Sequence, residues 1–187
     1  MVDTTDSADY YNTIARGYNL LHGDEQRFKL DAAAQHLHAH APRLFLQEKN
    51  DDKISVLDVG CGTGISSDYW AQKFGCDVVG VDPAAQLIEQ NENNLSKFVV
   101  GSAEKLPFAD GSFDFVVSFT AMQNFSDIET GLREIVRVAK PRKGWLVLTT
   151  LTGTPDLALI RKTLHALVDV KDEFIARNDT VFIARRR

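Results

Sequence analysis

The sequence has 187 residues, 44% of them apolar, which is enough for one domain with a core that needs no disulfides. Its formal charge of −5 argues against the broadly basic surface with which a protein holds nucleic acid, so DNA is not an expected partner. The two cysteines, Cys61 and Cys76, form no disulfide framework. The N-terminus lacks a signal-peptide pattern, and no run reaches the roughly 20 apolar residues that span a bilayer. We therefore expect a cytoplasmic protein without a membrane partner.

Two helices are expected ahead of the first strand. Apolar and aromatic residues recur at steps of three and four from Asp9 to Leu21, which predicts an amphipathic helix. A second helical pattern covers about Glu25 to His40 and is stopped by Pro42. Residues 1–50 should therefore form an N-terminal helical cap.

Strands and helices alternate along the rest of the chain. Strands are expected at 54–59, 78–81, 98–100, 113–119 and 145–150, and helices at 66–74, 84–93, 128–139 and after Pro155. Two last strands, 168–176 and 180–184, follow and must be antiparallel, because a tight turn near Asn178 joins them. Alternation of this kind requires a parallel sheet covered on both faces. We expect one α/β domain over residues 1–187, with its core at 54–187: a doubly wound, mostly parallel, seven-stranded Rossmann-like sheet with a C-terminal antiparallel hairpin.

The stretch VLDVGCGTG, residues 56–64, ends the first expected strand in an acid and three alternating glycines. Ligands of open sheets bind at the carboxyl ends of strands, and glycine lets the backbone turn tightly and approach a ligand closely. A dinucleotide site would have the spacing G-x-G-x-x-G, but here Ile65 occupies the position of its third glycine. Asp58, directly before the loop, would be badly placed beside a pyrophosphate. It suits a ligand that carries a positive charge.

The next two strand ends lie along the same edge. Asp82 can accept hydrogen bonds from both ribose hydroxyls of an adenosine. It can also cap the helix that begins after Pro83, and one side chain can serve both purposes. Ala103 and Glu104 follow the third strand, where a polar group can recognise an adenine amino group. A loop for a short charged tail, a carboxylate for ribose and a polar edge for adenine, without a phosphate site, fit S-adenosylmethionine, whose product is S-adenosylhomocysteine.

Four stretches resemble the successive motifs of class I S-adenosylmethionine-dependent methyltransferases, especially the branch of the ubiquinone and menaquinone biosynthesis enzymes. They are VLDVGCGTG, VVGVDPA, GSAEKLPFADGSFDFVVS and LREIVRVAKPRKGWLVLTT. The similarity runs from about Tyr10 to the C-terminus, and YNTIARGYNLLHGDEQ and TAMQNF also resemble small archaeal members of this branch. Some of those work with a small zinc-binding activator protein on tRNA or translation-factor substrates. The resemblance therefore implies such an activator and a tRNA or protein substrate as partners.

The resemblance also implies roles for single residues. Asp58 would bind the methionyl ammonium, while Gly60, Cys61 and Gly62 would contact the cofactor through the main chain. For adenine, the backbone of Ala103 is an alternative to the Glu104 side chain. Tyr18 lies on a helix that would fold over the cofactor, where it could reach the methionyl carboxylate or the sulfonium; a core-facing aromatic is the alternative. The complete expected set for the cofactor is Tyr18, Asp58, Gly60, Cys61, Gly62, Asp82, Pro83, Ala103, Glu104 and Phe119.

The candidates for contact with the methyl acceptor are Thr120, Gln123 and His22. Thr120 and Gln123 follow the fourth strand, where the family places the residues nearest the methyl group, although they could equally start a helix. His22 could contact substrate or act as a base, with a helix-terminal cap as the competing interpretation.

The three histidines of HLHAH are expected on a helix rather than a strand. His36 and His40 then share a face and His38 does not. We therefore expect no metal site.

The nature of the acceptor is open in the sequence. Displacement at the sulfonium methyl needs alignment, and a general base only if the acceptor must lose a proton. The N-P-P-Y type sequence of amide and adenine N-methyltransferases is replaced by SFTAMQNF. A short N-terminal extension and the lack of an inserted lid lead us to expect a macromolecular acceptor or a partner that completes the site. A non-catalytic cofactor-binding scaffold subunit and a methyltransferase for small quinone-type acceptors are the alternatives. A nicotinamide-dependent oxidoreductase would need the missing phosphate fingerprint.

Overall fold

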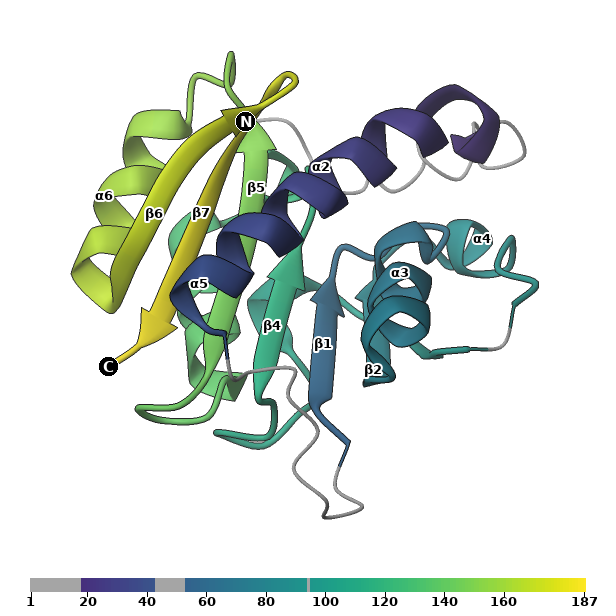
Figure 1. Ribbon diagram of the computed structural model, residues 1–187, viewed down its shortest axis with the longest axis horizontal. Helices are drawn as coiled ribbons and strands as arrows, with labels where there is room; N and C mark the ends of the chain where they lie inside the picture. The colour runs from purple at the N-terminus through teal and green to yellow at the C-terminus, as the bar shows by residue number, and fades with distance from the viewer. Residues whose placement is uncertain (1–17, 43–52, 94) are drawn as a thin grey trace.

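The computed structural model describes residues 18–42, 53–93 and 95–187, with the side chains of 18–22 left out. Its centre is a seven-stranded sheet of order β3-β2-β1-β4-β5-β7-β6 (Figure 1). The strands are β1 Ser55–Val59, β2 Asp77–Asp82, β3 Lys97–Val100, β4 Phe115–Ser118, β5 Trp145–Leu151, β6 Val168–Ala176 and β7 Asp179–Arg186. The helices are α2 Tyr18–His40, α3 Ile65–Phe74, α4 Ala85–Ile88, α5 Ile128–Val138 and α6 Leu157–Leu167, with short 3₁₀ turns η2 Ala103–Lys105 and η3 Met122–Asn124.

Strand pairing confirms the expected α/β architecture. β1 pairs in parallel with both β2 and β4, so the order of strands along the chain reverses at β1. β7 lies between β5 and β6 and is antiparallel to both of them. The carboxyl end of β1, where ligands of such sheets bind, is therefore the end that carries the glycine loop.

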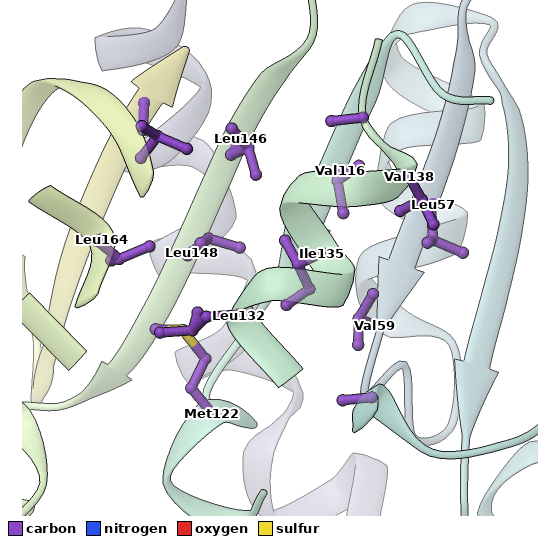
Figure 2. Packing of buried hydrophobic residues seen from close by; sticks show 14 of the residues in the cluster. Leu57, Val59, Val116, Met122, Leu132, Ile135, Val138, Leu146, Leu148 and Leu164 are labelled. Atoms are coloured by element: carbon purple, nitrogen blue, oxygen red, sulfur yellow. The ribbon is translucent and has the colours of Figure 1, made fainter. Parts of the chain in front are cut away.

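Helices cover both faces of the sheet, as an apolar parallel sheet requires. On one face, Leu30 and Leu37 of α2 and Trp70 of α3 pack with Phe115 and Val117. On the other, α5 places Leu132 and Ile135 against the sheet (Figure 2). The strand residues that they contact alternate with those of the first face: Leu57, Val116, Leu146 and Leu148.

Two expected helices differ in the structure. The first was expected to end at Leu21, and its residues 9–17 lie outside the described part of the chain. The gap expected between Leu21 and Glu25 is wrong, because α2 runs without a break from Tyr18 to His40. Gly23 is tolerated there, since a Cβ on it would meet nothing within 4 Å and α2 is held by its buried face further along.

The helix expected at 84–93 is also wrong in length, because α4 ends at Ile88. Asn91 and Asn93 point their side chains to Asp68 of α3, with nitrogen to Oδ2 distances of 2.9 and 2.7 Å. Asn91 also donates to the carbonyl of Thr63 at 3.2 Å. Asn91 Oδ1 also accepts the amide of Asn93 at 3.2 Å, so this amide is not available to a helical carbonyl and the helix ends early.

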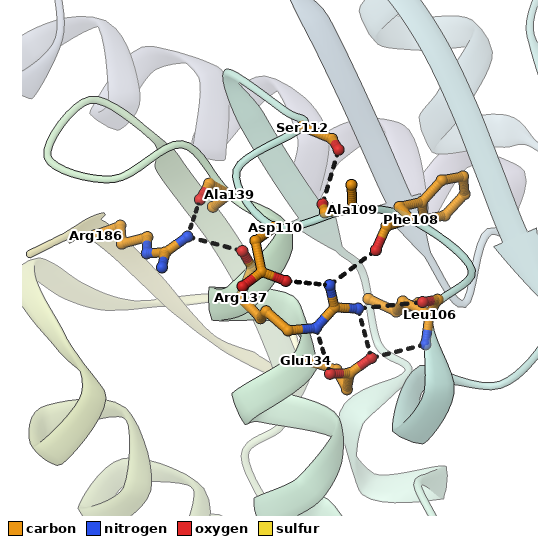
Figure 3. Close-up of polar contacts among 9 residues, drawn as sticks. All are labelled: Leu106, Phe108, Ala109, Asp110, Ser112, Glu134, Arg137, Ala139 and Arg186. Carbon is orange, nitrogen blue, oxygen red and sulfur yellow. Dashed lines mark hydrogen bonds and ion pairs between the residues drawn. The ribbon is translucent and has the colours of Figure 1, made fainter.

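A salt-bridge cluster on α5 holds the loop that follows η2 (Figure 3). Arg137 donates to the carbonyls of Leu106 and Phe108 and to Asp110, while it forms two bonds with Glu134. Glu134 in turn accepts the amide of Leu106 at 3.0 Å. The cluster thereby fixes residues 106–110 against α5.

His36 and His40 lie on one face of α2 and both contact Asp172 Oδ2 on β6, at 2.7 and 3.3 Å. His36 also stacks on Phe174, with ring centroids 3.6 Å apart. Among the described residues, no cluster of three or more metal-ligating side chains occurs. Within the same ranges, no helix has the length and apolarity to cross a membrane.

Candidate functional site

The glycine loop joins β1 to α3 and has three residues with positive φ. Gly60, Gly62 and Gly64 have φ of 74°, 54° and 85°, a region that glycine adopts without strain. At Gly64 the protein itself excludes a side chain, because a Cβ would lie 2.5 Å from Asn91 Nδ2 and 2.8 Å from Phe98. The three glycines are therefore needed for backbone geometry, but they differ in what lies beside them.

Gly60 faces protein. A Cβ there would lie 2.4 Å from the Cβ of Ala121, which follows β4. The amides of Gly60 and Cys61 both donate to the carbonyl of Val81, at 2.8 and 3.2 Å. Neither amide is thus free to serve a ligand as its main partner, which limits the expected main-chain role of these two residues.

Gly62 faces open space. The nearest atom to a Cβ there would be a methyl of Leu87, 3.8 Å away. The positive φ of Gly62 already favours glycine, and no neighbouring protein atom occupies the space beside it. This space is open to a ligand that lies against the loop.

Asp58 is fully buried near the carboxyl end of β1. Its Oδ2 accepts a hydrogen bond from Ser67 Oγ at 2.7 Å, and its Oδ1 has no hydrogen-bond partner among the described residues. Burial raises the pKa of Asp58 to about 7, against the opposing effect of the Ser67 bond. A buried carboxylate with one oxygen left over is suited to an ammonium group.

Asp82 ends β2 and ties the glycine loop to α4. Its Oδ2 accepts the amide of Gly62 and its Oδ1 that of Ala84, each at 2.8 Å. Burial raises the pKa of Asp82, and the two amide bonds oppose the rise. The capping role expected as an alternative is wrong, because the N-cap of α4 is Ala84 and no side chain caps the helix; Asp82 instead holds the amide of that N-cap residue. Since a carboxylate has about four acceptor sites, roughly two remain for ribose hydroxyls.

Glu104 has structural partners of its own. Its Oε1 accepts from the amide and the hydroxyl of Ser126, both at 2.7 Å, just before α5. Burial raises the pKa of Glu104, but these hydrogen bonds outweigh it and hold the pKa below its ordinary value. The side chain thus fastens η2 to α5, which favours the backbone of buried Ala103 as the group facing adenine.

Thr120 and Gln123, the candidates beyond β4, are both fully engaged. The Thr120 amide donates to Thr149 Oγ1 at 2.7 Å, and its hydroxyl donates to Asp179 Oδ2 at 2.6 Å. Gln123 donates to the Thr120 carbonyl at 2.6 Å and accepts from Thr150 at 2.9 Å. The alternative that these residues start a helix is met only by the short 3₁₀ turn η3, which includes Gln123 but not Thr120. Neither side chain is arranged as a free base.

The remaining predicted residues occupy the same edge of the sheet or its cover. Phe119 is buried at the end of β4, and Cys61 is buried in the loop, where burial raises the pKa of its thiol. Pro83 is exposed after β2. Tyr18 and His22 lie in the first turns of α2, but their side chains are outside the described part of the structure.

Sequence reasoning missed a buried ion pair between Lys29 of α2 and Asp179 of β7. Their Nζ to Oδ1 distance is 2.8 Å, with side chains 2% and 0% exposed. A signal existed, because Lys29 lies one turn before Ala33 on the apolar face of α2. In the sequence Asp179 lies at the tight turn predicted near Asn178, where an aspartate needs no further explanation.

A cavity of about 580 Å³ opens behind the glycine loop, between α2, α3 and the segment after α4. Thr63 and Ile65 of the loop line it, together with Arg27 and Asp68. None of the predicted cofactor residues whose side chains the structure describes lines this cavity, so it lies beside the candidate site.

Comparison with known proteins gives a consistent result. Residues 57–148 match the methyltransferase domain family. A demethylmenaquinone methyltransferase of Beutenbergia cavernae is 33% identical over 155 residues, which are 82% of this chain and 61% of the relative. A malonyl-[acyl-carrier protein] O-methyltransferase of Erwinia pyrifoliae is 37% identical over 112 residues, 59% of this chain and 42% of the relative. The chain thus spans about half the length of the curated relatives it matches.

Solved structures show the same fold at low sequence identity. A chain in the complex of the Haloferax volcanii Trm112 methyltransferase activator with a methyltransferase has a TM-score of 0.73 and 16% identity, covering 98% of this chain and 97% of that one. A TehB-like SAM-dependent methyltransferase of Corynebacterium glutamicum has a TM-score of 0.63 and 20% identity, covering 85% of this chain and 98% of that one.

Proposed function

The chain belongs to the class I S-adenosylmethionine-dependent methyltransferases, and on this premise we propose that it transfers the methyl group of S-adenosylmethionine to an acceptor molecule. The observation that carries the proposal is the open space beside Gly62, in a loop that follows the buried carboxylate of Asp58 and is held by the buried carboxylate of Asp82. A ligand there needs an ammonium for one carboxylate and hydroxyls for the other. The ligand should carry no phosphate group, because the carboxylate of Asp58, directly before the loop, would repel one.

The ammonium, the ribose and the adenine of the cofactor each have a group to hold them in this proposal. The unpartnered oxygen of Asp58 binds the methionyl ammonium, and the spare acceptor sites of Asp82 bind the ribose. The backbone at Ala103 faces the adenine edge, since Glu104 is engaged with Ser126. The bound cofactor supplies an activated methyl group, so the protein has only to align an acceptor and exclude water.

Neither Thr120 nor Gln123 serves as a general base in this scheme. The Thr120 hydroxyl donates to Asp179, and both ends of the Gln123 amide are hydrogen-bonded. An acceptor that must lose a proton would have to give it to water or to a group outside the described residues.

We favour a macromolecular acceptor, tRNA or protein, with a small activator protein as partner. The described segments after β4 and β5 are short, 119–127 and 152–156, so we expect them to contribute little to enclosing a small acceptor. A solved chain that matches this one over nearly its whole length comes from a complex with the Trm112 activator. The second candidate is a small quinone-type acceptor, which is supported by the relatives named demethylmenaquinone methyltransferases.

The test is methyl transfer from radiolabelled S-adenosylmethionine. The protein is assayed alone and mixed with a Trm112-type activator, on unmodified tRNA, on a translation-factor protein and on a demethylated quinol. Label in tRNA or protein only with the activator supports the first candidate, and label in quinol by the protein alone supports the second. Tight cofactor binding without turnover on any of these would favour a non-catalytic scaffold subunit. Calorimetry in which NADH binds and S-adenosylhomocysteine does not would refute the cofactor assignment.

A further inference from the structure

Thr120 has a backbone conformation that threonine normally avoids. Its φ is 54°, in the left-handed region where a β-branched residue is strained. Such a conformation persists only where the surroundings enforce it. All three polar groups of Thr120 are engaged: the amide with Thr149, the hydroxyl with Asp179 and the carbonyl with Gln123.

Lys29 completes this arrangement from a different layer of the molecule. Its ammonium forms ion pairs with Asp179 Oδ1 at 2.8 Å and Glu25 Oε1 at 2.9 Å, and it donates a hydrogen bond to Thr120 Oγ1 at 3.2 Å. Lys29 belongs to α2, whereas Thr120 ends the β4 region and Asp179 begins β7. One buried cation therefore fastens the covering helix to two strand ends.

The left-handed turn at Thr120 has a consequence at the next residue. It brings the Cβ of Ala121 to where a side chain on Gly60 would be, with 2.4 Å between Ala121 Cβ and an ideal Cβ on Gly60. Gly60 and Gly62 in turn are fixed by Val81 and Asp82. A continuous series of contacts thus runs from Lys29 through Thr120 and Ala121 to the glycine loop.

We propose that Lys29 is a positioning residue: through Thr120 it holds Ala121 against Gly60 and so fixes the loop that faces the cofactor. Without the ion pair, Thr120 relaxes toward negative φ and Ala121 moves away from Gly60. A glycine at 120 needs no such restraint, because glycine adopts positive φ freely. The effect on the cofactor rests on the proposed function, whereas the effect on the loop does not.

The first test is hydrogen exchange of the amides of Gly60, Cys61 and Gly62, measured by NMR on the cofactor-free protein. Lys29→Met with Asp179→Asn removes both charges, so neither is left buried alone. We expect these amides to exchange about tenfold faster, the scale set by left-handed strain at a non-glycine residue. Adding Thr120→Gly should bring exchange back to within about twofold of the native rate. The matched control is Lys73→Met with Asp31→Asn, which removes the exposed pair between α2 and α3 at 2.6 Å and should change nothing at the loop.

A comparison at position 120 covers the case in which the paired variant does not fold. Thr120→Val and Thr120→Gly both delete the hydroxyl, but only valine keeps the resistance to positive φ. We expect fast loop exchange in Thr120→Val and near-native exchange in Thr120→Gly. Equal exchange in the two, or a paired variant that Thr120→Gly does not rescue, overturns the proposal.

The affinity for S-adenosylhomocysteine, measured by calorimetry, separates this proposal from the proposed function. We expect the variants with fast loop exchange to bind about tenfold more weakly, since the loop must be fixed again on binding. If the native protein does not bind the compound, the proposed function fails. Hydrogen exchange of the loop amides then still tests whether Lys29 fixes the loop.

Discussion

Gly60 and Gly62 lie two positions apart, yet a methyl group should have different effects at each. At Gly60 it would overlap Ala121, with 2.4 Å between the two Cβ positions, whereas at Gly62 nothing lies closer than 3.8 Å. We expect Gly60→Ala to lower the free energy of unfolding by more than about 3 kcal/mol, since backbone strain and overpacking add. Gly62→Ala should cost only the strain, about 1–2 kcal/mol, but should remove cofactor binding. Denaturant unfolding and calorimetry on both variants check this, and cofactor affinity retained in Gly62→Ala would contradict the site.

Asp58 predicts how cofactor affinity depends on pH. Burial raises its folded pKa to about 7, whereas the unfolded chain releases this proton near pH 3.8. Because the folded state holds the proton more tightly, this group makes the cofactor-free protein less stable as pH rises from about 4 to about 7, and its contribution is constant above that. Ionised Asp58 is the form that attracts an ammonium. The affinity for S-adenosylhomocysteine should therefore rise as pH increases through about 7.

The control for this pH dependence is Asp58→Asn, which has nearly the same shape and no charge to titrate. Calorimetry at pH 6 and pH 8 should show weaker binding at the lower pH for the native protein and nearly equal binding for the variant. The same pH dependence in both proteins would mean that another group is responsible.

At the scale of elements, α5 does more than cover the sheet, because Arg137 holds the loop 106–110, which follows η2 (Figure 3). Arg137→Met keeps the aliphatic stem and loses every bond of the guanidinium. We expect the free energy of unfolding to fall by about 1–3 kcal/mol, as for hydrogen bonds to charged groups, and amide exchange in 106–110 to increase. The control is Arg133→Met, one turn earlier on the same helix and exposed. It should leave the free energy of unfolding and the amide exchange of residues 106–110 nearly unchanged.

The elements that the sequence predicted well are those whose signals are local. Apolar runs bounded by turns located β1, β2, β4 and β5, and Pro42 marked the end of α2. The length of α4 was not predictable, because its end depends on Asp68, which lies more than 20 positions from Asn91 and Asn93. The single helix through Gly23 was missed for a similar reason, since the packing further along α2 outweighs the cost of one glycine.

At the scale of the whole molecule, the same distinction separates the proposed cofactor residues from the network around Lys29. The glycine loop, Asp58 and Asp82 lie next to strand ends in the sequence, so the motif predicted them together. Lys29 and Thr120 are 91 positions apart, and Thr120 and Asp179 are 59 apart. Only the fold brings these three together, because α2 lies across the sheet near the ends of β4 and β7 (Figure 1). A buried lysine and a turn aspartate gave no indication in the sequence that they pair.

The last prediction concerns the whole folded state. A ligand that binds only the native protein adds RT ln(1 + [L]/Kd) to its stability, about 2.7 kcal/mol at a hundredfold excess over Kd. For a chain of 187 residues, this corresponds to a rise of roughly 5–10 °C in Tm. S-adenosylhomocysteine at that excess should produce such a rise, whereas NADH at the same concentration should produce none, because the acid before the loop opposes a pyrophosphate. Thermal unfolding of the native protein with each compound is the measurement, and Gly62→Ala should lose the response. A rise with NADH alone would mean that the loop holds a phosphate after all, despite Asp58.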